Sequence, residues 1–301
     1  MKPLDYKLVA ALAAVIREGS FERAADKLCI TQSAVSQRIK QLEQIMAQPL
    51  LVRSQPPGIT DAGQQLLGLY QRVTMLEQDV LDSICHQDDR QAVPVTLAVN
   101  ADSVATWLIP ALSPLLREEK IELNLRVDDE ARSLEIMRRG EAAAAISLDS
   151  HALPGCQSEY LGEVHYLCVC SPDFAKRHFP QGVTREALSS APAIAFDHRD
   201  DMHQNFLKEH FDLPHNEAPC HVVPSSEAFV TMAKAGIAYC MISEFQIQQE
   251  LEKGELINIL PELQDSRSLY WHHWVLETGR INALTRQVTK YARQILHEGH
   301  I

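Results

Sequence analysis

The segment from Thr31 to Ile45 carries two opposed stripes of side chains at helical spacing, and it constrains the fold more than any other part of the chain. Its apolar stripe recurs at intervals of four and three residues, so the stripe occupies one face of a helix, at Val35, Ile39 and Leu42. The opposite face has hydroxyl, amide and ammonium groups and no carboxylate, from Ser33, Ser36, Gln37 and Lys40. The segment therefore predicts a helix that packs by one side and offers hydrogen-bond donors on the other.

Two shorter helical segments precede it. Residues 5–18 place an apolar face on a first helix that ends at Gly19, a residue favoured just beyond a helix C-terminus. Ser20 is a strong N-cap for a second, short helix, in which Ala24 and Ala25 are small enough to let helices cross closely. Together the segments predict a helix-turn-helix, whose third helix fits the major groove of DNA.

An ordinary three-helix bundle with one polar face is the alternative, and the distribution of charge favours DNA. The chain has 28 Lys and Arg against 40 Asp and Glu, a net charge of -12. Residues 1–60 carry eight basic and five acidic residues, a balance of +3, which leaves the rest of the chain at -15. A basic head on an acidic body is typical of a protein that binds nucleic acid through the head.

A wing and a long helix are predicted next. Residues 48–59 are rich in Pro and Gly and predict a loop or small hairpin, from which Arg53 reaches a phosphate or the minor groove. Thr60 caps a helix that runs to about Cys85. Apolar residues repeat along it with a seven-residue period, followed by a second set three positions later: Leu66, Val73 and Val80, then Leu69, Leu76 and Ser83. This seam favours a self-associating coiled coil, with packing on the chain's own domain as the alternative.

After a polar linker at residues 87–94, strands and helices alternate in two series. The predicted strands lie at 95–99, 121–127, 143–147, 193–196, 221–223, 237–242, 256–260 and 270–274. Alternation of this kind argues for parallel, doubly wound sheets in two α/β lobes. A ligand in such folds lies where strand C-termini meet helix N-termini.

Polar residues follow several of these strands. The first strand ends at a helix start, where free N–H groups and hydroxyls suit a carboxylate, with Asn100, Asp102, Ser103 and Thr106. The second ends in three acids that suit the cationic part of a small molecule, or else form a solvated acidic turn: Asp128, Asp129 and Glu130. Analogous strand ends carry Ser147, Asp197, Ser225 and Ser226. One amino-acid-sized ligand between the lobes would use groups from both.

Enzyme signatures are missing, since the chain has no G-x-S-x-G, G-x-G-x-x-G, P-loop or H-E-x-x-H motif. One cluster of His and Asp around His198 and His203 leaves a metal-dependent enzyme open as an alternative, although its spacing matches no familiar ligand set. Seven Cys without a C-x-x-C pair indicate reduced thiols, and no apolar run is long enough for a membrane span. We expect a cytoplasmic protein that needs no cofactor or metal.

Four runs in the first 63 residues resemble the LysR-type transcriptional regulators: SFERAADKL at 20–28, TQSAVSQRIKQLE at 31–43, LLVR at 50–53 and TDAG at 60–63. Later runs resemble one branch of that family, the arginine- and lysine-responsive regulators of arginine export, also described as inhibitors of chromosome replication initiation. These runs are NADSVATW at 100–107, FDH at 196–198, DMHQ at 201–204, PCH at 219–221 and LYWH at 269–272. The similarity covers essentially the whole chain.

The resemblance implies an α plus α/β architecture with three parts. These are a winged helix-turn-helix DNA-binding domain at 1–60, a linker and dimerisation helix at 61–92, and a two-lobed effector domain similar to periplasmic binding proteins at 93–301. Lobe I is expected at about 93–162 plus 268–301, and lobe II at about 163–267. The residues that match the family's DNA-binding positions are Ser20, Phe21, Thr31, Gln32, Ser33, Ser36, Gln37, Lys40 and Arg53.

The resemblance also implies partners. We expect a homodimer or homotetramer that binds double-stranded operator DNA, acts with RNA polymerase at regulated promoters, and takes L-arginine or L-lysine as effector in the cleft between the lobes. A non-specific architectural DNA binder is a further alternative. The chain departs from the family at Ala47, where most members have Gly, at Leu51, where Phe is frequent, and at Pro56-Pro57, where a second wing base is common.

Overall fold

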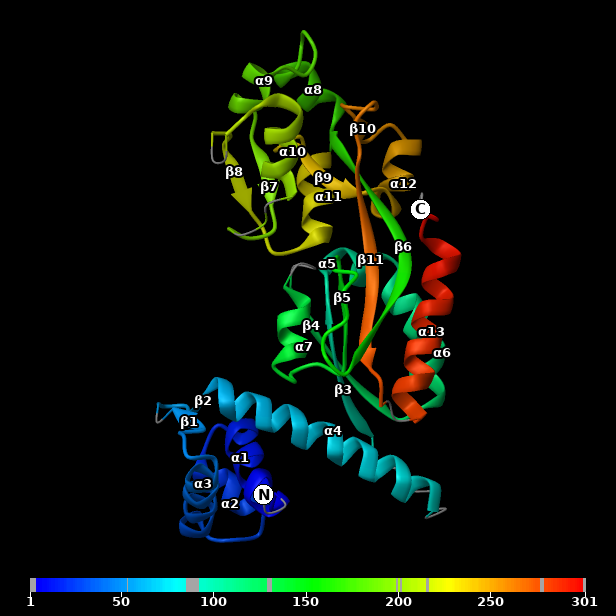
Figure 1. Ribbon diagram of the computed structural model, residues 1–301. Coiled ribbons are helices and arrows are strands. Elements are labelled where there is room, and N and C mark those ends of the chain that lie inside the picture. Colours follow the sequence, from blue (N-terminus) through cyan, green and yellow to red (C-terminus); the bar gives the residue numbers. More distant parts are fainter. Residues whose placement is uncertain are drawn as a thin grey trace.

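The computed structural model describes residues 4–52, 54–84, 92–128, 132–198, 200, 202–214, 217–276 and 279–299. Figure 1 shows a small helical head, a long helix leading away from it, and two α/β lobes stacked above. Three residues singled out in the sequence, Arg53, Asp129 and Glu130, lie outside the described residues. Among the helices that are described, none combines the length and apolar character required to cross a membrane.

The head contains the predicted helix-turn-helix and wing. Its elements are α1 (Tyr6–Glu18), α2 (Phe21–Lys27), α3 (Gln32–Met46) and a two-stranded hairpin of β1 (Leu51–Val52) and β2 (Gly58–Ile59). Each helix begins at a side-chain cap: Asp5 accepts from Lys7 N, Ser20 from Glu22 N, and Thr31 from Ala34 N. The α1 helix ends at Gly19, whose φ of 64° is the left-handed conformation that favours glycine. Local capping therefore fixes the helix boundaries that the sequence predicts.

The head's core lies where the apolar stripe of α3 meets α1. Val35, Ile39 and Leu42 are buried against a cluster that includes Leu12 and Val15 of α1. The wing is tied to the end of α3 because the Glu43 carboxylate accepts hydrogen bonds from the backbone N–H groups of residues 50 and 51, at 2.9 and 3.4 Å. The wing consequently holds a fixed position beside α3.

The long helix α4 (Asp61–Ile84) begins at Thr60, whose hydroxyl accepts from Gly63 N at 3.1 Å. It passes beneath the lower lobe (Figure 1) and contacts that lobe through Gly68, where an added Cβ would lie 2.5 Å from the Gly140 Cα. One turn further on, the Arg72 guanidinium lies 3.9 Å from the centre of the Trp274 ring. Of the predicted seam, Leu69 and Val80 are exposed in the single chain.

Lobe I is the lower α/β unit in Figure 1. Its strands are β3 (Val93–Val99), β4 (Ile121–Val127) and β5 (Ala144–Ser147), and both β4 and β5 pair with β3 in parallel. Its helices are α5 (Ala101–Ser103), the π-helical turn η1 (Val104–Leu108), α6 (Ile109–Glu118), α7 (Ser133–Arg138) and α13 (Gly279–Ile295). The carboxyl ends of β3 and β4 point toward the upper lobe, which places residues 100 and 128 at the boundary between lobes.

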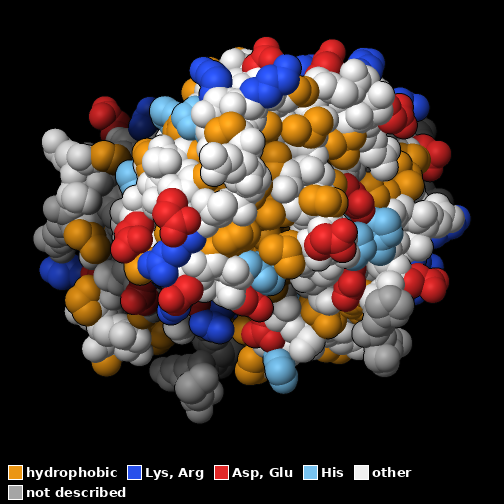
Figure 2. Space-filling model, turned by 90° about the horizontal axis from the view of Figure 1, so that it is seen from above, with side chains coloured by type: hydrophobic (Ala, Val, Ile, Leu, Met, Phe, Trp, Pro, Cys, Tyr) orange, Lys and Arg blue, Asp and Glu red, His pale blue; other side chains and the backbone are white. Residues whose placement is uncertain are grey.

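Lobe II is the upper unit. Its strands are β7 (Ala193–Ala195), β8 (Cys220–Val222), β9 (Cys240–Ser243) and β10 (Ile257–Asn258). Its helices are α8 (Pro172–His178), α9 (Arg185–Ser190), α10 (Met202–Phe211), α11 (Ser226–Lys234) and α12 (Glu244–Glu252). Seen from above, the space-filling view in Figure 2 shows Lys, Arg, Asp and Glu side chains interspersed with apolar ones on this end of the molecule.

Two long strands connect the lobes, β6 (Cys156–Cys170) and β11 (Asp265–Trp274), and they pair antiparallel along ten residues of β11. The main sheet has the order β10-β6-β11-β5-β3-β4, with β9 also paired to β6. The expectation of wholly parallel sheets is therefore corrected, because the crossing strands make the sheet mixed. The sequence did not predict β6, α8 or α9, and it predicted only the last half of β11.

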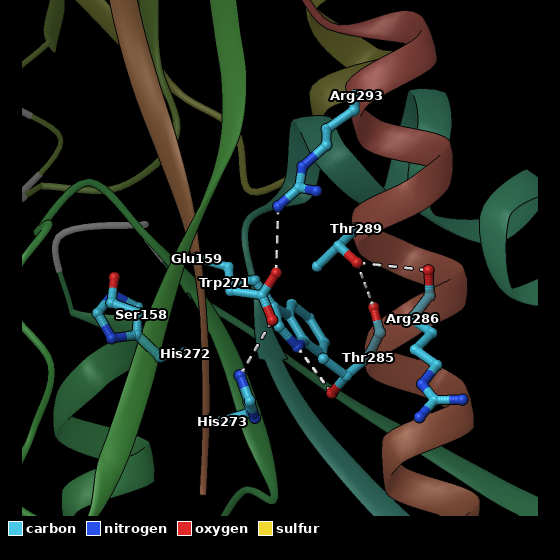
Figure 3. A network of polar contacts seen from close by, with 9 residues as sticks. All are labelled: Ser158, Glu159, Trp271, His272, His273, Thr285, Arg286, Thr289 and Arg293. Carbon is cyan, nitrogen blue, oxygen red and sulfur yellow. Dashed lines mark hydrogen bonds and ion pairs between the residues drawn. The ribbon is translucent and has the colours of Figure 1, made fainter. Parts of the chain in front are cut away.

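A polar network holds the crossing strands to α13 (Figure 3). The Trp271 indole donates to the Thr285 hydroxyl at 3.1 Å, and the Glu159 carboxylate contacts His273 at 3.4 Å and Arg293 at 3.2 Å. His272 lies on the other face of β11, with Nε2 2.7 Å from the Asp149 carbonyl oxygen. The two neighbouring imidazoles thus have separate surroundings, as alternation along a strand predicts.

Candidate DNA interface and effector cleft

The outward face of α3 is the candidate DNA interface. Its side chains are exposed and share one side of the helix: Gln32, Ser33, Ser36, Gln37 and Lys40. Thr31 is also exposed, but its hydroxyl caps α3. No described carboxylate lies among them on α3, so the face offers donors to phosphates and base edges.

Two of the residues expected to contact DNA, Ser20 and Phe21, stabilise the head itself. The Ser20 hydroxyl accepts from the backbone at residues 22 and 23, at 3.2 and 3.5 Å, and so fixes the start of α2. Phe21 is half-buried and packs against the core of the head. Both residues hold α2 at its angle to α3. A contact of either residue with DNA stays a prediction.

A cavity lies between the lobes, at the carboxyl ends of β3 and β4. Three carboxylates, an amide and a hydroxyl line it, from Asp102, Asp128, Asp200, Asn100 and Ser226. The rest of the lining is mainly apolar or aromatic, from Ala101, Tyr166, Ile194, Phe196, Met202, His203, Phe229, Met241 and Ile242. An aliphatic stem that ends in a cation matches both halves of this lining.

Asp102 links the lobes at the inner end of the cavity. The Tyr166 hydroxyl of β6 donates to its Oδ2 at 2.7 Å, and the Ser226 hydroxyl of α11 donates to its Oδ1. Nearby, Asn100 is buried and its side-chain oxygen has no hydrogen-bond partner within the described part of the chain. A buried acceptor without a partner is costly, and a ligand ammonium group would satisfy it.

Asp128 and Asp197 are also brought together, although they come from different lobes. Arg132, at the start of α7, contacts Asp128 Oδ1 at 2.7 Å and Asp197 Oδ2 at 2.8 Å. Both acids were predicted from the sequence as ligand-binding residues, but Arg132, which contacts them both, was not. A signal was present, since Arg132 follows the acidic run by two residues.

Four other predicted residues do not line this cavity, because local hydrogen bonds or packing occupy them. Thr106 donates to the backbone oxygen of Asp102 at 2.6 Å, and Ser147 accepts from Asp149 N at 3.1 Å. Ser225 caps α11 by accepting from Ala228 N at 3.2 Å, and Ser103 is buried within lobe I. Strand ends carry such polar residues for turn and cap formation as well as for ligands.

His203 forms part of the cavity wall and is not arranged as a metal ligand. It is buried, its Nε2 lies 3.0 Å from the Tyr239 hydroxyl, and burial lowers its pKa to about 4. His198 is exposed. Within the described ranges, the residues close enough to share a metal are instead His165, Glu244 and His297. There His297 pairs with Glu244, and His165 lies 2.8 Å from the Ser266 hydroxyl.

Comparisons with known proteins assign the family. Residues 6–64 match the bacterial regulatory helix-turn-helix protein family of the LysR type, and residues 89–293 match the LysR substrate binding domain. The "HTH-type transcriptional regulator ArgP" of Photobacterium profundum is 58% identical over 296 residues, which cover 98% of this chain and 99% of that protein. The chain belongs to the LysR-type transcriptional regulators.

Two solved structures extend the similarity to the whole fold. ArgP from Mycobacterium tuberculosis has a TM-score of 0.86 and 34% identity, covering 99% of this chain and 100% of that one. Full-length LysG from Corynebacterium glutamicum with bound effector Arg has a TM-score of 0.78 and 30% identity, covering 98% and 100%. These relatives favour a DNA-binding regulator with an effector domain over the metal-dependent enzyme and the architectural DNA binder that the sequence left open.

Proposed function

We propose that this regulator binds L-arginine or L-lysine in the cleft between its lobes and thereby controls genes of arginine and lysine transport and metabolism. The observation that carries the proposal is the lining of the cavity, with carboxylates beside an apolar wall. Arginine and lysine have the matching parts, an aliphatic stem and a terminal cation. The LysG relative, which is described with bound effector Arg, supports the same ligand class.

The sequence prediction gave the end of β3 to the effector's carboxylate, but Asp102 and the side-chain oxygen of Asn100 offer acceptors in the cavity, so we assign the effector's cations to them. Ser226, the first residue of α11, is assigned to the same ligand from lobe II. Asp129 and Glu130 stay predicted contacts for the cationic part of the effector. An effector held by both lobes stabilises the arrangement in which they are close, and this differential affinity is what shifts a regulator between states.

The DNA side of the proposal uses α3 and the wing. The exposed polar face of α3 enters the major groove of operator DNA, with Arg53 as a predicted wing contact. We further propose a cytoplasmic homodimer or homotetramer that acts with RNA polymerase at regulated promoters. Support for the dimer comes from α4, where Leu69, Val80 and Leu81 are 39%, 56% and 56% exposed in the single chain. A second copy of α4 would bury them.

Isothermal titration calorimetry tests the effector. The wild-type protein is expected to bind L-arginine or L-lysine, and glutamate, which carries the opposite charge, is expected not to bind. Asp102→Asn removes one carboxylate from the cavity and is expected to weaken binding, whereas Asp173→Asn changes an exposed acid in lobe II, outside the cavity lining, and serves as its control. Failure of the wild type to bind either basic amino acid would reject the proposal.

A further inference from the structure

Arg132 connects the two lobes beside the cavity. Its guanidinium contacts Asp128, which follows β4 of lobe I, at 2.7 Å. It also contacts Asp197, which follows β7 of lobe II, at 2.8 Å. One cation therefore neutralises an acid from each lobe.

The surroundings of Arg132 make this contact stronger than a surface ion pair. Its side chain is 23% exposed, and those of Asp128 and Asp197 are 32% and 30% exposed. Partial burial reduces screening by water, and a planar guanidinium is well suited to hold two carboxylates at once. Removal of the cation would leave two carboxylates of opposite lobes near each other, and their repulsion favours separation of the lobes.

A second interlobe contact lies deeper in the cleft, between Asp102 and Ser226. Both of these residues line the cavity, so an effector that binds there competes for their hydrogen-bonding groups. Arg132 and Asp197 do not line the cavity. Their contact can therefore persist while the effector is bound, whereas the inner contact is rearranged.

We propose that Arg132 is a clasp that holds the lobes together over the bound effector, through Asp128 on one side and Asp197 on the other. This inference rests on the proposed function for its ligand. Arg132 acts as a positioning residue: it sets how long the cleft stays closed and therefore how slowly the effector leaves. The clasp predicts that affinity depends on Arg132 and Asp197 although neither lines the cavity.

The experiment compares Arg132→Gln, Asp197→Asn and the double variant by calorimetry and stopped-flow displacement of L-arginine and L-lysine. Each single variant is expected to bind the effector about tenfold more weakly, mainly through faster dissociation, and the double variant is expected to be little worse than either. Arg138→Gln is the matched control, because it breaks an ion pair with Glu135 that lies within α7 and does not reach lobe II. Unchanged or tighter binding by Arg132→Gln would overturn the clasp, and tighter binding would show that Arg132 competes with the effector.

A second readout separates the clasp from the identity of the effector. Hydrogen–deuterium exchange of the protein without effector is expected to be faster in Arg132→Gln than in wild type, at the segments that face the cleft from lobe II, residues 194–198 and 226–229. If the wild type bound neither basic amino acid, the proposed effector would be wrong, and faster exchange would still support the interlobe link. Unchanged exchange in these segments would contradict that link.

Discussion

The head and the effector cleft of this protein are built in different ways. In the head, contacts within about the first 70 residues fix the elements: caps start the helices, Glu43 holds the wing to α3, and Leu67 of α4 completes the core. In the body, the cleft combines residues as distant in sequence as Asp102 and Ser226. The comparison indicates that the polar face of α3, the proposed DNA-binding surface, is specified locally, whereas the cleft exists only when two lobes meet. A ligand can therefore act on the cleft without remodelling α3 itself.

The strongest test of this separation is charge reversal on α3. Lys40→Glu places a carboxylate on the exposed donor face, and a symmetric dimer would carry the change twice. We expect retention of operator DNA in a gel shift to be abolished, with a loss of more than about 100-fold in affinity. Binding of arginine or lysine by calorimetry is expected to stay unchanged. Lys176→Glu, at an exposed site in lobe II, is the control that leaves both activities intact.

Acid is expected to affect the body through His203. Its pKa is lowered from an ordinary 6.5 to about 4 by burial, so between these pH values the unfolded chain takes up a proton that the folded chain does not. Stability is therefore fully present above pH 6.5 and falls as the pH drops toward 4, by up to about 3 kcal/mol from this residue.

Urea denaturation at pH 7.5 and pH 4.5 measures this effect. His203→Gln is expected to lose less stability on acidification than the wild type. His210→Gln, on the exposed side of the same helix α10, is expected to behave like the wild type. Equal acid sensitivity of wild type and His203→Gln would show that His203 is not the group responsible.

A carboxylate change in the cleft is expected to have a smaller effect, and mainly on effector binding. Asp128→Asn removes the charge that Arg132 contacts from lobe I and one acid of the cavity lining. We expect arginine binding to weaken about tenfold. Operator affinity without effector is expected to change by less than effector affinity, because Asp128 lies in lobe I and affects the head only through the position of the lobes. A loss of effector-free operator binding would mean that the two regions are not separable.

The smallest expected effect concerns the turn after α3. Ala47 has a φ of 54°, a left-handed conformation that is unfavourable for residues with a Cβ. Ala47→Gly relieves this and is expected to stabilise the protein by about 1 kcal/mol. Ala34→Gly, within the regular helix α3, is expected to destabilise it by a similar amount. Thermal melting of both variants checks the signs, and a lower melting temperature for Ala47→Gly would contradict the assignment of strain.

The same difference explains what could be predicted from the sequence. The head was predicted almost completely, since Gly19, Ser20 and Thr31 mark helix ends by local chemistry. The crossing strand β6 was missed because two adjacent buried residues, Leu161 and Gly162, interrupt its alternation and its partner β11 lies about a hundred residues away. Strand pairing at such distance leaves no local signal.

For the cleft, residue type and position at a strand end predicted some of the cavity residues, but they could not show which of the candidates face the cavity. Asn100, Asp102, Asp128 and Ser226 were predicted and do line the cavity. Thr106, Ser147 and Ser225 have the same chemistry at equivalent strand ends, but their hydroxyls are used within their own turns and helices. Only the fold distinguishes a hydroxyl that caps a helix from one that faces a ligand.

An effector in the cleft between the lobes is proposed to change how the head binds operator DNA. Fluorescence anisotropy of a labelled operator duplex, at fixed salt and with increasing L-arginine or L-lysine, tests it most directly. We predict that at least one of the two changes the operator Kd by about 5- to 150-fold at saturation, and that Asp102→Asn requires a higher effector concentration for the same change. An operator Kd that stays constant with saturating concentrations of both amino acids would contradict the account.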